Sequence, residues 1–174
     1  MGYTHYFTKK ELTHPQDTWD NFVRDTRKVA NRFNLVKPKS IDFIKDSLSK
    51  VKDSTSQIKI GDGLGEGHPP VFSKDEICFN GVGEEAHETL LIERDNSDIL
   101  TKTGRWSKYY KETWEKDHTY EGFVKTARKP YDLLVTATLV LYKHHFGDIV
   151  EISGDGGEEG FEEGKKLISE VLGI

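Results

Sequence analysis

Near the start of the chain, the spacing of apolar residues changes from that of a strand to that of a helix. Tyr3–Thr8 alternates, with Tyr3, His5 and Phe7 sharing one face, which predicts a strand. A capping-box pattern at Thr13–Gln16, with a proline inside it, predicts the start of a helix. The apolar residues that follow recur at helical spacing and share one face: Trp19, Phe22, Val23, Val29, Ala30 and Phe33.

The middle of the chain predicts shorter elements separated by turns. A second helix is expected after Ser40, and the glycines and prolines of Gly61–Pro70 predict a loop. Lys74–Asn80 and Ala86–Asp95 are predicted to form a β-hairpin. Aromatic and charged residues are mixed in Asn96–Thr119, where we expect one short helix flanked by loops.

The last third of the chain predicts a strand, a helix, a second strand and a final helix. The expected strands are Gly122–Thr126 and Ile149–Ser153, and the expected helices are Pro130–Phe146 and Glu158–Leu172. Because helices and hairpins are interspersed rather than regularly alternating, we predict an α+β fold. Residues 1–174 should form a single domain, in which a mixed or antiparallel sheet of about five or six strands packs against three or four helices.

Composition narrows the classes of function. The 174 residues carry a net charge of −5, which argues against non-specific binding of nucleic acid by the whole surface. The single cysteine, Cys78, excludes an internal disulfide, and the chain shows neither a signal-peptide pattern nor a long apolar run, so we expect a cytoplasmic protein. The seven histidines lack metal-ligand spacing, and Gly61–Pro70 lacks the lysine of a phosphate-binding loop. We therefore expect neither a metal site nor a cofactor.

A basic block precedes the long helix of the last third. Pro130 suits the first helical position, so Arg128 and Lys129 lie beside the helix N-terminus, where cations are unfavourable by roughly 0.3–1 kcal/mol each. Local violations of this kind tend to mark functional sites. We therefore predict that the phosphate or other anionic group of a small, nucleotide-related ligand binds here. The residues predicted to hold the anion are Lys125, Thr126, Arg128 and Lys129, with Tyr131 and Asp132 shaping the site.

A purely structural interpretation of this block stays open. Asp132, in the first helical turn, could offset the dipole and pair with Arg128, leaving the other cations in water. Whether any reaction takes place is also open. His5 is the first candidate for a general acid or base, although a strand histidine among aromatic residues is more often a packed, hydrogen-bonded core residue.

Several segments resemble an uncharacterised protein family of bacterial and phage genomes. They are GYTHYF (Gly2–Phe7), a glycine-rich loop before Phe79–Gly81, KTARKPYD (Lys125–Asp132) and HFGD (His145–Asp148). The resemblance covers most of the chain and implies that its two ends meet in one fold. No activity is known for that family, so the resemblance assigns no catalytic residue.

A second class of function follows from segment 105–114, where lysine and arginine interleave with tryptophan and tyrosine. Such a composition is typical of surfaces that stack single-stranded nucleic acid. The alternative function is therefore a non-enzymatic interaction protein that binds nucleic acid or a protein partner here. A purely structural interpretation of the same segment is an amphipathic helix that packs Trp106, Tyr110 and Trp114 inward. We favour a phosphate-containing small molecule over nucleic acid as the partner, and expect no membrane contact.

Overall fold

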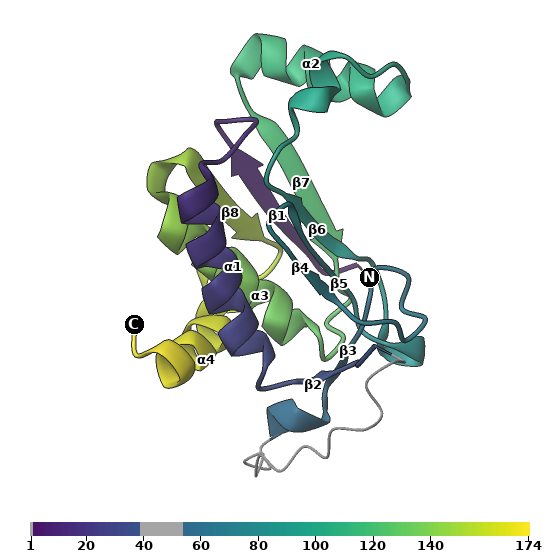
Figure 1. Cartoon of the computed structure of the whole chain (residues 1–174), viewed down its shortest axis with the longest axis vertical. Coiled ribbons are helices and arrows are strands. Elements are labelled where there is room, and N and C mark those ends of the chain that lie inside the picture. Colours follow the sequence, from purple (N-terminus) through teal and green to yellow (C-terminus); the bar gives the residue numbers. More distant parts are fainter. Residues whose placement is uncertain (1, 39–53) are drawn as a thin grey trace.

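A computed structural model describes residues 2–38 and 54–174 of the chain (Figure 1). Within this part, four α-helices and eight short strands form an α+β single domain, which confirms the predicted fold class. The strands are divided among three small sheets rather than joined in one. The helix expected after Ser40 lies outside the described residues. No described helix is long and apolar enough to cross a membrane.

The first sheet brings the N-terminal strand between two strands from the last third of the chain. It contains β1 (Thr4–Lys9), β7 (Tyr120–Lys125) and β8 (Val150–Gly154) in the order β7-β1-β8, with both pairs antiparallel. Thr4 lies opposite Lys125, and His5 lies opposite Gly154. The register therefore places the residues that follow β7 beside the start of β1.

Two further sheets complete the strand layer. In the second sheet, β4 (Val71–Phe72), β5 (Glu76–Phe79) and β6 (Leu90–Glu93) are antiparallel in that order. The pairing of β5 with β6 confirms the predicted hairpin. In the third sheet, β2 (Asn34–Leu35) runs parallel to β3 (Lys59–Ile60).

Three of the helices pack together against the sheets, and the fourth projects away from them (Figure 1). The packed helices are α1 (Gln16–Ala30), α3 (Asp132–Phe146) and α4 (Glu162–Leu172), and the projecting helix is α2 (Arg105–Asp117). Nine of the fifteen residues of α3 are buried, because this helix lies between strands on one side and α1 and α4 on the other. Short 3-10 helices occupy Ser54–Gln57, Gly83–Glu85, Ser97–Leu100, Gly147–Ile149 and Glu158–Phe161.

The start of α1 differs from the capping box that the sequence predicts. Pro15 takes the N-cap position and makes no side-chain capping bond, while the Thr13 hydroxyl donates to Asp95 at 2.7 Å. The apolar face of α1 is as predicted, with Trp19 and Phe22 fully buried. Tertiary contacts thus replace the local cap, and the hydrophobic face positions the helix.

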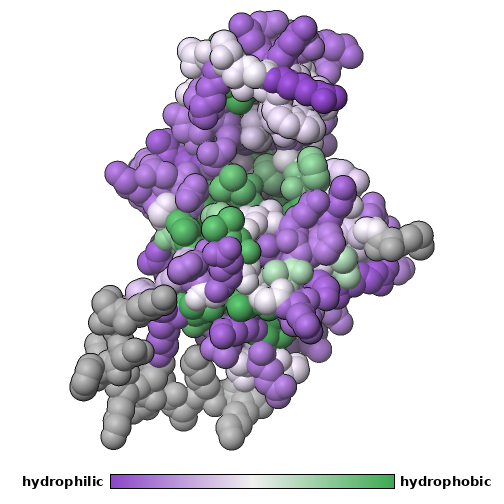
Figure 2. Space-filling model, turned by 90° about the vertical axis from the view of Figure 1, so that its right-hand side faces the viewer, coloured by the Kyte–Doolittle hydropathy of each residue, from purple (hydrophilic) through white to green (hydrophobic). Residues whose placement is uncertain are grey.

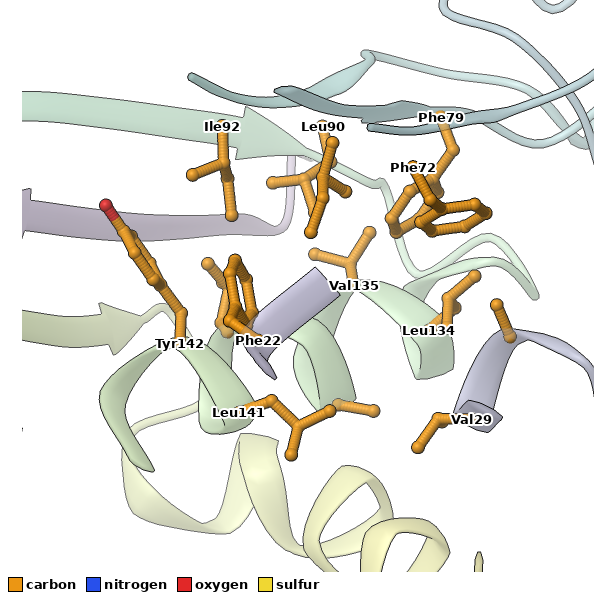
Figure 3. Packing of buried hydrophobic residues seen from close by; sticks show 14 of the residues in the cluster. Phe22, Val29, Phe72, Phe79, Leu90, Ile92, Leu134, Val135, Leu141 and Tyr142 are labelled. Carbon is orange, nitrogen blue, oxygen red and sulfur yellow. The ribbon is translucent and has the colours of Figure 1, made fainter. Parts of the chain in front are cut away.

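The core joins the second sheet to α3 and α1. Figure 3 shows Leu90 and Ile92 of β6 pointing toward α3, whose Val135 lies below them, with Phe22 of α1 alongside. All of these side chains are at most 1% exposed. Burial of each such side chain is worth roughly 1.5–3 kcal/mol, so this layer anchors α3 and with it the segment that precedes it.

In the first sheet, Phe7 requires a glycine on the neighbouring strand. Phe7 lies opposite Gly122, and a Cβ added to Gly122 would come within 2.1 Å of the Phe7 ring. The ring therefore lies directly over the bare backbone of β7 and then contacts Tyr142 of α3 edge to face. This close approach holds β7, and the turn that follows it, against the helical layer.

Candidate functional site

The basic block folds into a tight turn with an unusual backbone. The Lys129 N–H donates to the Thr126 carbonyl at 2.9 Å, and the two residues between them, Ala127 and Arg128, have φ of 50° and 56°. Positive φ at both central positions is typical of a type I′ turn, which normally carries glycine or asparagine. For other L-residues the left-handed conformation costs roughly 1–2 kcal/mol each. Two such residues in succession point to a functional constraint on this turn.

Asp132, the first residue of α3, links this turn to β1. Its Oδ1 accepts a hydrogen bond from His5 Nε2 at 2.7 Å, and the Thr126 hydroxyl donates to the same oxygen. His5 and Thr126 are both fully buried, whereas the Asp132 side chain is 21% exposed. Within the described residues, Asp132 therefore pairs with His5, and the Asp132–Arg128 ion pair of the structural interpretation is not formed.

A surface cavity of about 410 Å³ opens beside Asp132. Arg128 and Lys129 line one part of it, and Glu159 and Glu163 line another. Tyr3 contributes to the wall: the Arg128 guanidinium lies over its ring, 4.3 Å from the centroid. This volume lies in the range of small-molecule sites, so the turn, Tyr3 just before β1, and the segment that leads into α4 together form a candidate ligand site.

Tyr3 is held in place by two glycines. A Cβ at Gly156 would come within 2.1 Å of the Tyr3 hydroxyl oxygen, and one at Gly160 within 2.7 Å. The glycine-rich turn after β8 thus leaves room for the phenol, and the ring forms the platform for Arg128. Our sequence reasoning missed Tyr3, Glu159 and Glu163 as site residues. The glycines of segment 154–160 could have indicated that another side chain packs against this turn, because closely spaced glycines often permit a close approach to the backbone.

The structure separates the predicted anion-binding residues into two groups. Arg128, Lys129 and Asp132 line the cavity, and Thr126 supports Asp132 from behind. Arg128 is exposed and has no carboxylate partner among the described residues, while the Lys129 ammonium donates to the Glu84 carbonyl at 2.7 Å.

Lys125 and Tyr131 lie on the other side of the turn, around Glu88. The Lys125 ammonium is 3.9 Å from a Glu88 carboxylate oxygen, and the Tyr131 hydroxyl donates to the Glu88 carbonyl at 2.6 Å. Burial raises the pKa of Tyr131 well above its ordinary value. These two residues do not line the cavity, because successive side chains on β7 alternate between faces and Tyr131 points into the core.

His5 supports the site from inside the protein rather than facing the cavity. Its ring packs edge to face on Tyr3 and Phe161, with centroids 5.1 and 5.4 Å away. Its Nδ1 is buried without a hydrogen-bond partner, and a Cβ at Gly154 would come within 2.7 Å of that atom. The geometry agrees with the packed, hydrogen-bonded histidine that the sequence left open, and it assigns His5 the role of orienting Asp132.

A second polar cluster, which the sequence analysis did not single out, is buried at the far end of β1. Lys9 is fully buried, and its ammonium donates to the carbonyls of Leu12 and Glu93 at 3.1 Å each. Burial lowers the pKa of Lys9 to about 8. His14 is also buried, bonds to the Tyr142 hydroxyl at 2.6 Å and has its pKa lowered by burial to about 3.

Helix α2 does not pack its aromatic residues as the amphipathic interpretation expects. No residue of α2 is buried, and Trp106 is 69% exposed. Tyr110 stacks on Tyr120 with ring centroids 5.0 Å apart, and this contact ties the helix to β7. In Figure 2 the projecting helix is mostly hydrophilic with pale areas, and hydrophobic residues gather on the body below it.

Two further observations bear on what this site could bind. Among residues 2–38 and 54–174, no group of three or more His, Cys, Asp or Glu side chains is arranged to hold a metal ion. Comparison with protein-family models, with curated proteins and with solved structures found no match for this chain.

Proposed function

We propose that this protein binds a small phosphate-bearing ligand, such as a nucleotide or a sugar phosphate, in the cavity at the start of α3. One observation carries the proposal. Arg128 is held over Tyr3 by two consecutive left-handed residues, is exposed, and has no carboxylate partner among the described residues. A guanidinium held in this way is preorganised for a bidentate contact with phosphate.

Lys129 supports the same assignment, whereas the backbone at the start of α3 adds little to it. Lys129 lines the same cavity, and its ammonium donates to the neutral Glu84 carbonyl, so its charge is not neutralised by a carboxylate within the described part of the chain. The first turn of α3 contributes little direct hydrogen bonding, because the N–H groups of Asp132 and Leu134 already donate to preceding carbonyls at 2.9 and 3.0 Å. Side chains, rather than the helix N-terminus itself, would therefore hold the anion.

Thermal shift against nucleotides, sugar phosphates and pyrophosphate tests this function. A stabilising ligand should lose its effect in Arg128→Ala and keep it in Arg105→Ala, which removes an exposed arginine from α2. Both variants remove one positive charge from the surface, so the comparison separates a specific contact from a general change in charge. The absence of a shift with every phosphate compound would contradict the proposal.

A second candidate function uses helix α2 as an interaction surface for nucleic acid or a protein partner. The exposure of Trp106, and of Tyr109 at 48% one helical turn further on, favours it, because exposed apolar side chains that lie close together are typical of interaction surfaces. The charges are less favourable for nucleic acid, since Lys108 lies 3.7 Å from Glu112 and is partly neutralised.

Binding to a single-stranded oligonucleotide distinguishes these two partners. Stacking on Trp106 predicts that Trp106→Ala weakens the binding, and contacts with phosphates predict a steep loss of affinity as salt is raised. Binding that is absent or insensitive to salt would exclude nucleic acid and leave a protein partner as the remaining form of this candidate.

A further inference from the structure

The cavity beside Asp132 carries negative as well as positive side chains. Glu159 and Glu163 come from the 3-10 helix Glu158–Phe161 and the first turn of α4, and they lie across from the basic turn. The two lysines of α4, Lys165 and Lys166, do not neutralise them. The Lys165 ammonium pairs with Glu158 at 3.6 Å and with Glu162 at 2.8 Å, and Lys166 forms no ion pair within the described residues. Within the described residues, the two glutamates of the wall therefore have no ion-pair partner.

Asp132 adds a third carboxylate, and its orientation is fixed. Both of its hydrogen bonds, from His5 and from Thr126, go to Oδ1. The donors are fully buried and lie behind the carboxylate, so its rotation is restricted. Oδ2 receives neither bond, so it is free to accept one from a ligand in the cavity, to which Asp132 contributes. A carboxylate oxygen can only accept a hydrogen bond, so it selects a donor on the ligand.

The charges of the site are not balanced for a simple anion. Two cations and three carboxylates line the cavity. A phosphate alone would be attracted by Arg128 and Lys129 but repelled by the acidic wall, and because Arg128, Glu159 and Glu163 are exposed, both effects should weaken as salt is raised. A ligand that also carries a protonated amine would satisfy both parts, because its ammonium can donate to several carboxylates at once.

We propose that the ligand is dipolar: a phosphomonoester that also carries a protonated amine, with the phosphate on Arg128 and Lys129 and the ammonium on Asp132, Glu159 and Glu163. This inference rests on the proposed function, and it names the class of ligand. The cavity of about 410 Å³ suits a small molecule of this kind.

Three small probes separate the contributions: O-phosphoethanolamine, inorganic phosphate and ethanolamine. Calorimetric titration of the whole chain should show that O-phosphoethanolamine binds roughly tenfold or more tightly than phosphate, since each charged hydrogen bond adds about that factor. Ethanolamine alone should bind more weakly than O-phosphoethanolamine. In the double variant Glu159→Gln/Glu163→Gln, the affinity for O-phosphoethanolamine relative to that for phosphate should fall toward a ratio of one. Phosphate binding itself should be retained or improved.

A matched control uses the glutamates of the same segment that face Lys165. Glu158→Gln/Glu162→Gln changes the net charge by the same amount but removes carboxylates that do not line this cavity. It should keep the preference. Circular dichroism of both double variants establishes that they fold.

The outcomes distinguish the two proposals. Equal binding of phosphate and O-phosphoethanolamine, lost in Arg128→Ala, would overturn the dipolar ligand and support the phosphate site. An equal loss of the preference for O-phosphoethanolamine in Glu159→Gln/Glu163→Gln and in Glu158→Gln/Glu162→Gln would also overturn the dipolar ligand. Binding of O-phosphoethanolamine that survives Arg128→Ala unchanged, or no binding of any phosphate probe, would overturn the phosphate site itself and the dipolar ligand with it.

Discussion

Replacing the buried Lys9 by methionine should remove the pH dependence that this lysine imposes on folding. Lys9 is fully buried, and its ammonium has two carbonyl acceptors at 3.1 Å but no carboxylate within ion-pair distance among the described residues. Removal from water is the main cause of its lowered pKa, which Glu93 only partly offsets. Methionine has a similar length and no charge, so it removes the titration and keeps most of the packing.

The sign follows from proton binding in the two states. The folded protein releases the Lys9 proton near pH 8, whereas the unfolded chain holds it to about pH 10.5. Between these values the unfolded state binds more protons, so the free energy of unfolding rises with pH. At about 1.4 kcal/mol per pH unit, the total is roughly 3 kcal/mol, of which about 2.5 kcal/mol falls between pH 7 and pH 10.

Urea denaturation of the wild type and Lys9→Met at pH 7, 8.5 and 10 measures this difference. The wild type should gain about 2.5 kcal/mol relative to the variant across the series, while tyrosine titrations affect both proteins equally and cancel. The neighbouring Lys10 provides the control. It is exposed, its pKa is raised by a hydrogen bond to Glu151, and Lys10→Met should show no such gain below pH 10. Parallel stability curves for wild type and Lys9→Met would refute the reasoning.

Three further predictions concern particular contacts. Ala127→Gly should raise the free energy of unfolding by about 1 kcal/mol in urea denaturation, because glycine adopts positive φ without the Cβ clash; a destabilised variant would contradict the strain at this turn. Gly122→Ala should lower the free energy of unfolding by roughly 2–3 kcal/mol, because its Cβ would meet the Phe7 ring, and Phe7→Leu should restore part of that loss; wild-type stability in the single variant would show that the sheet can move aside. As pH falls from 6.5 toward 3, the unfolded chain protonates at His14 before the folded protein does, so the wild type should lose stability relative to His14→Gln by a few kcal/mol; a constant difference in acid denaturation would show that His14 is not held neutral.

Much of the fold could be predicted because burial repeats with a local period. Helix α1 was predicted from apolar residues three and four apart, and β1 was predicted from alternation within one residue of its observed bounds. The hairpin of β5 and β6 was predicted from turn residues that lie between two apolar runs. In contrast, the division of the strands into three sheets depends on which edges pair, and strand composition does not encode that choice.

The candidate site was predicted only in part. The charge rule for helix starts pointed to the correct turn, because a cation beside a helix N-terminus is a local feature of the sequence. It did not reveal that Lys125 faces Glu88 while Lys129 faces the cavity, since the backbone reverses between them through two left-handed residues. Nor could it show that Tyr3 forms the platform under Arg128.

The sequence by itself determined the helical and extended segments and the single cysteine, because these depend on composition and short-range spacing. Only the tertiary structure decided that His5 bonds to Asp132, 127 residues further along the chain, and that Lys9 is removed from water. The physical reason is the register of β1 between β7 and β8, which places the first strand of the chain beside two strands from its last third. Hydrogen bonds form only between atoms about 3 Å apart, so their partners are chosen by that register rather than by proximity in the sequence.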